Sequence, residues 1–314
     1  MLKNKYLALL FLCFLVFLLL PQGTTASPLL QTQDEFQMRN NETSAQIFSI
    51  KLFGGLGKLV GQNDVNENLN GWNQLLNDSA NMAGFGISGE ISPLGYSPSF
   101  GGELIFNFNP RFSIGLGAEY LRFTKQSTKI LTLEGESIDF SIDPSISAIP
   151  ITLSFYYGIP LGNFLNVVVG VGGGYYLGQY KNSTLQIIAD EQVMLSFRSN
   201  KNTIGAHGSL TFEFNIGRSL ALIFGVSGRM AKLKNLMGTE TFTYTTPSYT
   251  DSEDYPDLTL WYVEDEIFEG RYYSSLIADN VKPETSYYRN VREAEISLSS
   301  MTLQIGILIR FGKQ

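Results

Sequence analysis

The feature that most constrains the fold of this sequence is an alternation of apolar and polar residues at every second position. In one segment, Phe112, Ile114 and Leu116 alternate with serine or glycine. Alternation at period two is typical of β-strands, because successive side chains point to opposite faces. Eight segments show it, near residues 48–52, 100–109, 112–120, 149–157, 165–175, 203–214, 220–230 and 301–311. Most are long enough to cross a membrane, for which a tilted strand needs about 9–11 residues.

The connections between these segments alternate between short and long. Three are tight, at residues 109–111, 158–163 and 215–218. The other four span roughly 40, 25, 25 and 60 residues, and this alternation is typical of outer-membrane barrels with short periplasmic turns and long outer loops. A soluble β-sandwich gives no reason for loop lengths to sort in this way.

The two faces of the predicted strands differ in residue type. One face is uniformly large and apolar, which suits contact with lipid, and the other is polar or small. We expect the polar face to line the interior as a network of charged and polar groups, because three acids and three bases nearly balance and unpaired buried charge is costly. Its members are Lys51, Glu103, Glu119, His207, Glu213, Arg229 and Arg310.

These patterns predict an all-β fold: an eight-stranded antiparallel transmembrane β-barrel over residues 46–314. The sheet must close, because backbone groups in lipid have to pair internally. An eight-stranded barrel is only wide enough to be filled by its side chains, so an open pore is not expected. A narrow porin-like channel for small solutes stays open as an alternative.

The first 26 residues have the layout of a secretory signal peptide. Lys3 and Lys5 precede an apolar run, Pro21 breaks it, and small residues lead to Ser27. Removing this segment removes two lysines, no acid and the only cysteine, so the net charge falls from −7 to −9. Residues 27–45 are polar and aperiodic, and we interpret them as a flexible periplasmic leader.

Composition agrees with an envelope protein. Only 16% of the residues are charged, below the roughly 25% of an ordinary soluble domain. The acidic balance argues against a nucleic-acid partner, which requires a basic face. We expect the protein in the bacterial outer membrane, with its lipid as a partner.

Three of the long connections carry structure of their own. In the first, Val65, Leu69, Trp72 and Leu76 follow a capping-box-like start at 64–67, which favours a short amphipathic helix over the barrel mouth rather than an unstructured loop. Residues 138–142 and 193–197 also alternate. They are either extensions of spanning strands or two more spanning strands, which would make ten.

The last connection, residues 237–293, is rich in tyrosine. Between Asp251 and Glu269 it contains eight acids and no base, without the ligand spacing of a calcium site, so we predict a solvated acidic face, no metal and no cofactor. Aromatic residues on loops above a rigid scaffold suit recognition of an unknown extracellular ligand. The candidates are Trp72, Tyr249, Tyr255, Trp261, Tyr262, Tyr272 and Tyr273.

Five segments resemble the small outer-membrane β-barrel family of OmpA-like and opacity-type porin-family proteins. They are residues 48–59, 112–123, 149–160, 167–178 and 303–312. The resemblance implies a barrel inserted by the outer-membrane assembly machinery, which reads a terminal aromatic residue; here Phe311 is followed by Gly-Lys-Gln. It implies no activity. We expect a non-enzymatic scaffold that displays its outer loops for binding, adhesion or envelope integrity.

His207 is the one residue that raises an enzymatic alternative. With Ser209 it is similar to the His-x-Ser pair of outer-membrane lipid A deacylases, in which histidine activates serine for acyl transfer. Strand parity places both residues inside the barrel, whereas acyl chains lie outside it. We therefore predict no catalytic residue, and a lipid A-modifying hydrolase is the less favoured hypothesis.

Overall fold

The computed structural model describes residues 48–134, 136–268, 270–286 and 288–312. These residues belong to one of the two compact units of the chain. The expected signal peptide and periplasmic leader, residues 1–26 and 27–45, lie outside the described residues.

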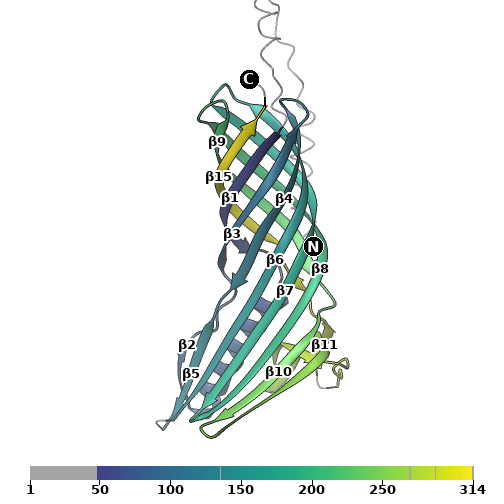
Figure 1. Cartoon of the computed structure of the whole chain (residues 1–314). Coiled ribbons are helices and arrows are strands. Elements are labelled where there is room, and N and C mark those ends of the chain that lie inside the picture. Colours follow the sequence, from purple (N-terminus) through teal and green to yellow (C-terminus); the bar gives the residue numbers. More distant parts are fainter. Residues whose placement is uncertain (1–47, 135, 269, 287, 313–314) are drawn as a thin grey trace, which may run out of the picture. The chain divides into compact units, whose positions relative to one another are not determined.

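Eight antiparallel strands close into a ring (Figure 1). Each strand pairs with a neighbour on both sides, and the β8–β9 pairing completes the circle. Successive ring strands pair in the order β1, β3, β4, β6, β7, β8, β9, β15 and back to β1. Their bounds are β1 (Phe48–Leu59), β3 (Tyr96–Asn107), β4 (Phe112–Thr124), β6 (Glu136–Pro160), β7 (Leu165–Ile188), β8 (Glu191–Asn215), β9 (Leu220–Leu233) and β15 (Ser300–Phe311).

The eight predicted segments all lie on these ring strands, with segment 100–109 running two residues past the end of β3, but the prediction of eight strands in all was wrong. The sheet has fifteen strands. β6, β7 and β8 run on for 24 or 25 residues, and the chain beside them pairs with their far ends. The added strands are β2 (Gly86–Gly89), β5 (Ser127–Leu133), β10 (Met237–Thr246), β11 (Tyr249–Phe268), β12 (Arg271–Asp279), β13 (Tyr288–Glu293) and β14 (Ile296–Ser297).

The part beyond the ring is a folded body rather than a set of loops. We call it the extension and define it as residues 61–95, 125–143, 181–200 and 234–295. The stretches at 138–142 and 193–197 lie in β6 and β8, so they continue ring strands and are not additional spanning strands. The connection between β7 and β8 shortens to two residues because both strands are long.

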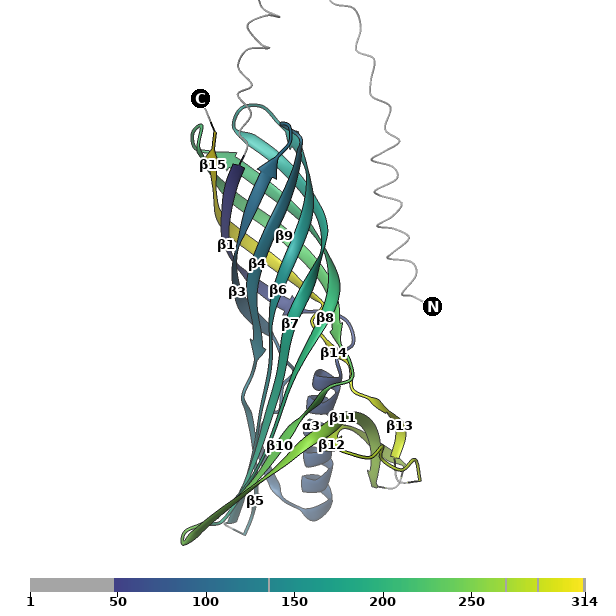
Figure 2. The ribbon, with the colours of Figure 1, turned by 45° about the vertical axis from the view of Figure 1, so that its right-hand side comes forward.

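A single long helix, α3 (Asp64–Ala83), runs through the extension (Figure 2). Its N-cap is Asn63, one residue before the predicted start, and the Asn63 side chain accepts a hydrogen bond from the Val65 amide at 3.1 Å. The helix ends at Gly84, whose φ of 74° favours glycine. Among the described residues, no helix is long and apolar enough to cross a membrane.

The apolar spacing predicted for this helix is the face that it buries. Val65 and Leu69 are fully buried, and the Trp72 ring stacks on Phe140 of β6 at 4.8 Å between centroids. On its other side α3 packs against β12. The helix is 20 residues long and packs one face against strands of the extension, which differs from the expected short helix lying over the barrel mouth.

Candidate functional site

The outer surface of the ring is apolar on every strand. Every ring strand exposes at least one large hydrophobic side chain, and the eight examples given below are exposed by 37% (Leu210) to 69% (Leu303). We call this surface the apolar belt. Soluble proteins rarely expose continuous apolar patches of more than a few hundred Å². One member from each strand is Leu52, Leu104, Leu116, Leu153, Val171, Leu210, Leu222 and Leu303.

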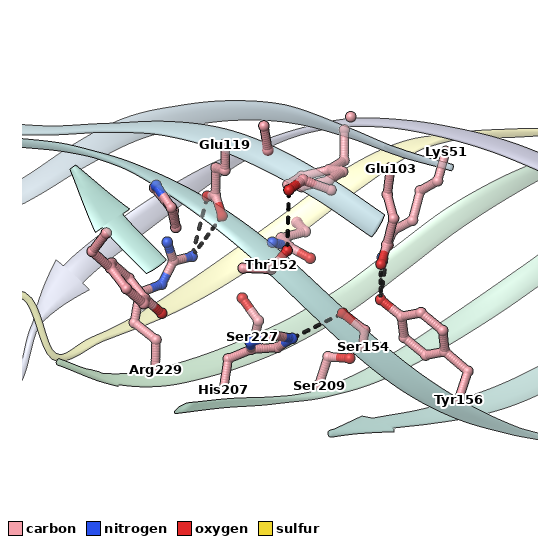
Figure 3. A pocket seen from close by; sticks show the side chains of 17 residues that line it. Lys51, Glu103, Glu119, Thr152, Ser154, Tyr156, His207, Ser209, Ser227 and Arg229 are labelled. Carbon is pink, nitrogen blue, oxygen red and sulfur yellow. Dashed lines mark hydrogen bonds and ion pairs between the residues drawn. The ribbon is translucent and has the colours of Figure 1, made fainter. Parts of the chain in front are cut away.

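The interior of the ring contains a small polar chamber (Figure 3). Its volume is about 60 Å³. Five of the seven residues expected in the interior network line it, namely Lys51, Glu103, Glu119, His207 and Arg229. The polar face of the alternating strands therefore meets in one place, because the ring brings strands that are distant in sequence across from each other.

The charges of the chamber are paired. Arg229 contacts Glu119 at 3.0 Å, and both side chains are nearly buried. Lys51 lies 3.8 Å from Glu103, and the Tyr156 hydroxyl donates to the Glu103 carboxylate at 2.7 Å. Two positive and two negative groups thus compensate each other.

The remaining two predicted residues form a separate pair. Arg310 contacts Glu213 at 2.7 Å, and Arg310 also donates to Asn215. This pair lies nearer the tight turns than the chamber does, because Glu213 precedes the β8–β9 turn and Arg310 is close to the end of β15. The interior charges are therefore grouped at two levels.

His207 has a different partner from those that the sequence offered. Its Nε2 lies 3.0 Å from the Ser154 Oγ of β6. Ser209 lines the same chamber, whereas Glu213 pairs with Arg310. Nδ1 of His207 and the Ser227 Oγ are buried and have no hydrogen-bond partner among the described residues. This arrangement lacks the carboxylate that would orient a catalytic histidine.

Apolar side chains close the ring interior on both sides of the chamber. Toward the tight turns, a buried cluster is formed by Ile105, Ala221, Ile223 and Leu308, with Phe53 and Tyr156 packed against it. Toward the extension, Leu121, Phe123, Ala231 and Leu233 join the larger core that also contains α3. The expectation of a uniformly polar or small interior was therefore wrong. A narrow ring is filled by side chains, and apolar ones fill it as well as polar ones.

The predicted network did not include Ser154 and Tyr156, two lining residues that hydrogen-bond to its members His207 and Glu103. Ser154 and Tyr156 share the parity of Thr152, which the alternation of residues 149–157 places on the interior face. That parity was a usable signal for both residues. Their contacts with His207 and Glu103 were not predictable, because β6 is not a sequence neighbour of β8 or β3.

The extension separates the seven aromatic recognition candidates into two groups. Tyr262 and Tyr273 are buried, and their hydroxyls bond to Ser274 and Asp78. Trp72 is stacked in the core, and Trp261 donates to the Asp279 carbonyl. These four side chains hold the extension together, so the expectation that they form a recognition surface needs correction.

The other three candidates lie at the surface. Tyr249 and Tyr255 are well exposed. Tyr272 is partly covered by the Arg289 guanidinium, 3.2 Å above its ring, and donates to Glu266. All three lie on β11 or β12, and the first half of β11 is exposed throughout.

Charged contacts fasten α3 to the strands of the extension. Arg292 binds both oxygens of Asp64 at 2.6 and 2.7 Å, and this contact raises the pKa of the Arg292 guanidinium. The Tyr273 hydroxyl, which donates to Asp78 at 2.6 Å, lowers the pKa of that carboxyl. Burial raises the pKa of Tyr262 to about 12. In the described part of the chain, no group of three or more His, Cys, Asp or Glu side chains could hold a metal ion.

Comparison with known proteins gives one similar structure to report. No protein-family model matches the chain, and no curated protein matches it. The crystal structure of the outer membrane protein OprG from Pseudomonas aeruginosa is similar over 86% of this chain and 98% of that one, with 12% sequence identity and a TM-score of 0.33.

Proposed function

We propose that this protein is an eight-stranded transmembrane β-barrel of the bacterial outer membrane that holds a folded extension at the cell surface. The observation that carries the proposal is the apolar belt. Exposing it to water would cost roughly 25 cal/mol for each Å², and lipid removes that cost. The closed ring leaves no unpaired strand edge in its wall, as a lipid environment requires.

The orientation follows from the lengths of the connections. The three tight turns join β3 to β4, β6 to β7 and β8 to β9 at one end of the ring. The extension lies at the other end. Because outer-membrane barrels have short periplasmic turns, the extension would face the outside, where it could contact an extracellular ligand through its exposed face on β11.

The interior favours a scaffold over a channel. Apolar clusters lie on both sides of the chamber, and the buried charges between them are paired. A narrow channel is the second candidate, because the chamber is polar and holds unpartnered groups at His207 and Ser227. A catalytic role for His207 has less support, since its ring lies inside the barrel and lipid lies outside.

Reconstitution tests the proposal. Purified protein should float with phospholipid vesicles and should migrate differently on gels before and after boiling, as a folded barrel does. In planar bilayers it should give no steady conductance. Recovery of folded protein in buffer without detergent would contradict the membrane assignment. Steady channels from an inserted protein would instead favour the second candidate.

A further inference from the structure

Basic residues stand where the apolar belt ends on one side of the ring. On β1 the outward series runs through Leu52 and Leu56 and then reaches Lys58. On β4 it passes Tyr120 and reaches Arg122. On β9 it passes Met230 and reaches Lys232. All three basic side chains are exposed.

The strands of this side end close to these residues. β1 ends at Leu59, β4 at Thr124 and β9 at Leu233, each within two residues of its basic side chain. β15 and β3 lie between them in the ring, and these five strands are consecutive neighbours. Neighbouring strands are about 4.8 Å apart, so the three basic residues fall within roughly 20 Å along the rim. We call this part of the rim the basic sector.

Most of the positive charge in the basic sector is free of carboxylates. Lys58 lies 5.3 Å over the Tyr96 ring. Neither Lys58 nor Arg122 forms an ion pair within the described part of the chain. Lys232 and Lys234 share one acid, Glu295, at 2.7 and 2.5 Å. Together with Lys234, which follows the end of β9, the three basic residues of the sector have one acid among them, an excess of three positive charges.

Aromatic side chains mark the same level as an interface. Tyr96 and Phe100 of β3 are exposed by 67% and 64%, and the Phe100 ring contacts Tyr120 of β4 at 5.4 Å. Exposed aromatic residues of this kind lie at the boundary between hydrocarbon and headgroups. The basic groups just beyond them would therefore be at the depth of the lipid phosphates.

The opposite side of the rim is built differently. On β6, β7 and β8 the outward series continues with the neutral residues Ser147, Gln179 and Asn202, and these strands run on into the extension. Gln179 donates to Asn200 at 2.7 Å, so amides bond to each other there. At this level the outward series of the three long strands is therefore neutral, and its next basic residues, Lys181 of β7 and Arg198 of β8, lie two and four residues farther into the extension.

We propose that the basic sector binds the phosphate groups of a glycolipid in the outer leaflet. This inference rests on the proposed function, because it needs the extension to face the outside. Lysine and arginine bind phosphate by charge and by several donated hydrogen bonds. The apolar belt directly below Lys58 and Arg122 would hold the acyl chains of the same lipid, so headgroup and tail would be recognised together.

Native mass spectrometry of the full-length protein released from neutral detergent micelles tests this site. The probe is bisphosphorylated lipid A, compared with the same lipid after removal of both phosphates and with phosphatidylglycerol. Each basic residue near an anionic surface contributes roughly a fivefold change in affinity. The Lys58→Gln/Arg122→Gln variant should therefore bind the phosphorylated lipid roughly 25-fold more weakly.

The matched control is Lys181→Gln/Arg198→Gln, which removes two exposed basic residues of β7 and β8 from the extension on the opposite side. It should bind like the unaltered protein. Equal binding by the Lys58→Gln/Arg122→Gln variant, or equal binding of the phosphate-free lipid, would overturn the inference. Equal binding of phosphatidylglycerol would overturn the assignment to the outer-leaflet glycolipid.

Vesicle flotation and the gel shift on boiling are measured on the same samples. These measurements distinguish failure of the lipid-binding proposal from failure of the membrane proposal. A protein that inserts but does not distinguish the lipids contradicts the basic sector alone. A protein that does not insert contradicts the membrane proposal, and the basic sector with it.

Discussion

At the scale of single residues, paired charges determine what the ring interior tolerates. Arg229 and Glu119 are both nearly buried and 3.0 Å apart. Breaking such a pair by removing one partner is costly because the other charge stays buried. Replacing both partners costs much less. The value of the pair therefore lies mainly in mutual compensation.

Arg229→Met should lower the free energy of unfolding by about 3–5 kcal/mol, because Glu119 would keep an uncompensated charge. The Glu119→Gln/Arg229→Met double variant should recover a large part of that loss. Urea unfolding in lipid vesicles, followed by the gel shift on boiling, measures both. A double variant as unstable as the sum of the two single variants would show that the two side chains do not interact.

Acid should weaken the attachment between the ring and the extension at Glu295. Hydrogen bonds from Lys232 and Lys234 lower the pKa of this carboxyl from 4.5 to about 2. Because the pKa of Glu295 is lowered in the folded state, the ionised carboxylate contributes fully to the free energy of unfolding above pH 4.5. This contribution is lost as the pH falls toward 2.

Both tryptophans, Trp72 and Trp261, lie in the extension, so tryptophan fluorescence reports its unfolding. We expect Glu295→Gln to remove part of the loss of stability between pH 4.5 and 2. Glu284 forms no ion pair in the described part of the chain, so Glu284→Gln is the control. An identical pH profile for Glu295→Gln and the unaltered protein would argue against this role of the carboxyl.

At the scale of elements, the position of α3 depends on close approach to β12. Gly71 faces the backbone of Ser274, and a Cβ at this position would overlap the Ser274 carbonyl oxygen. A glycine inside a helix is unfavourable by itself. Here it permits the helix to pack between β12 on one side and β6 on the other.

Gly71→Ala should therefore destabilise the extension, although alanine is the better helix former. We expect a loss of about 1–3 kcal/mol from overpacking, seen as an earlier transition in tryptophan fluorescence, with an unchanged gel shift of the barrel. Gln74→Ala, on the exposed side of α3, should change little. An extension as stable as the unaltered one would mean that α3 can shift away from β12 without cost.

The ring strands and α3 could be predicted from the sequence, and most of the extension could not. Local alternation identified the eight ring strands, and the spacing of Val65, Leu69 and Trp72 identified the helix. β10 to β13 form strands in the extension, whose core they share with α3 and β6. No single segment of the sequence therefore indicates how these strands pair. For the same reason Tyr262 and Tyr273 resembled surface residues until their neighbours were known.

The candidate site was predictable to a similar degree. Strand parity assigned Lys51, Glu103 and His207 to one face, and five of the seven expected residues line one chamber. Their pairings depend on strand register: Lys51 and Glu103 are direct partners on β1 and β3, and His207 reaches Ser154 across Gly172 of β7. Alternation specifies the face on which a side chain lies, but it does not specify its contacts.

At the scale of the whole molecule, the ring and the extension share three strands but differ in where their apolar side chains lie. In the ring large apolar side chains cover the outer face as well as filling part of the interior, whereas in the extension they face inward around α3. β6, β7 and β8 pass from one body to the other. The level at which apolar residues change sides should therefore mark the membrane surface.

The exposure of alternate positions on β15 tests the membrane-facing belt most directly. Single cysteines at Met301, Leu303 and Ile305 and at Thr302 and Gln304, each carrying a spin label, would be measured in lipid vesicles with Cys13 replaced. We predict that labels at Met301, Leu303 and Ile305 collide freely with oxygen dissolved in lipid, and that labels at Thr302 and Gln304 do not. The reverse pattern, in a protein that stays folded in water without detergent, would contradict the membrane-spanning barrel.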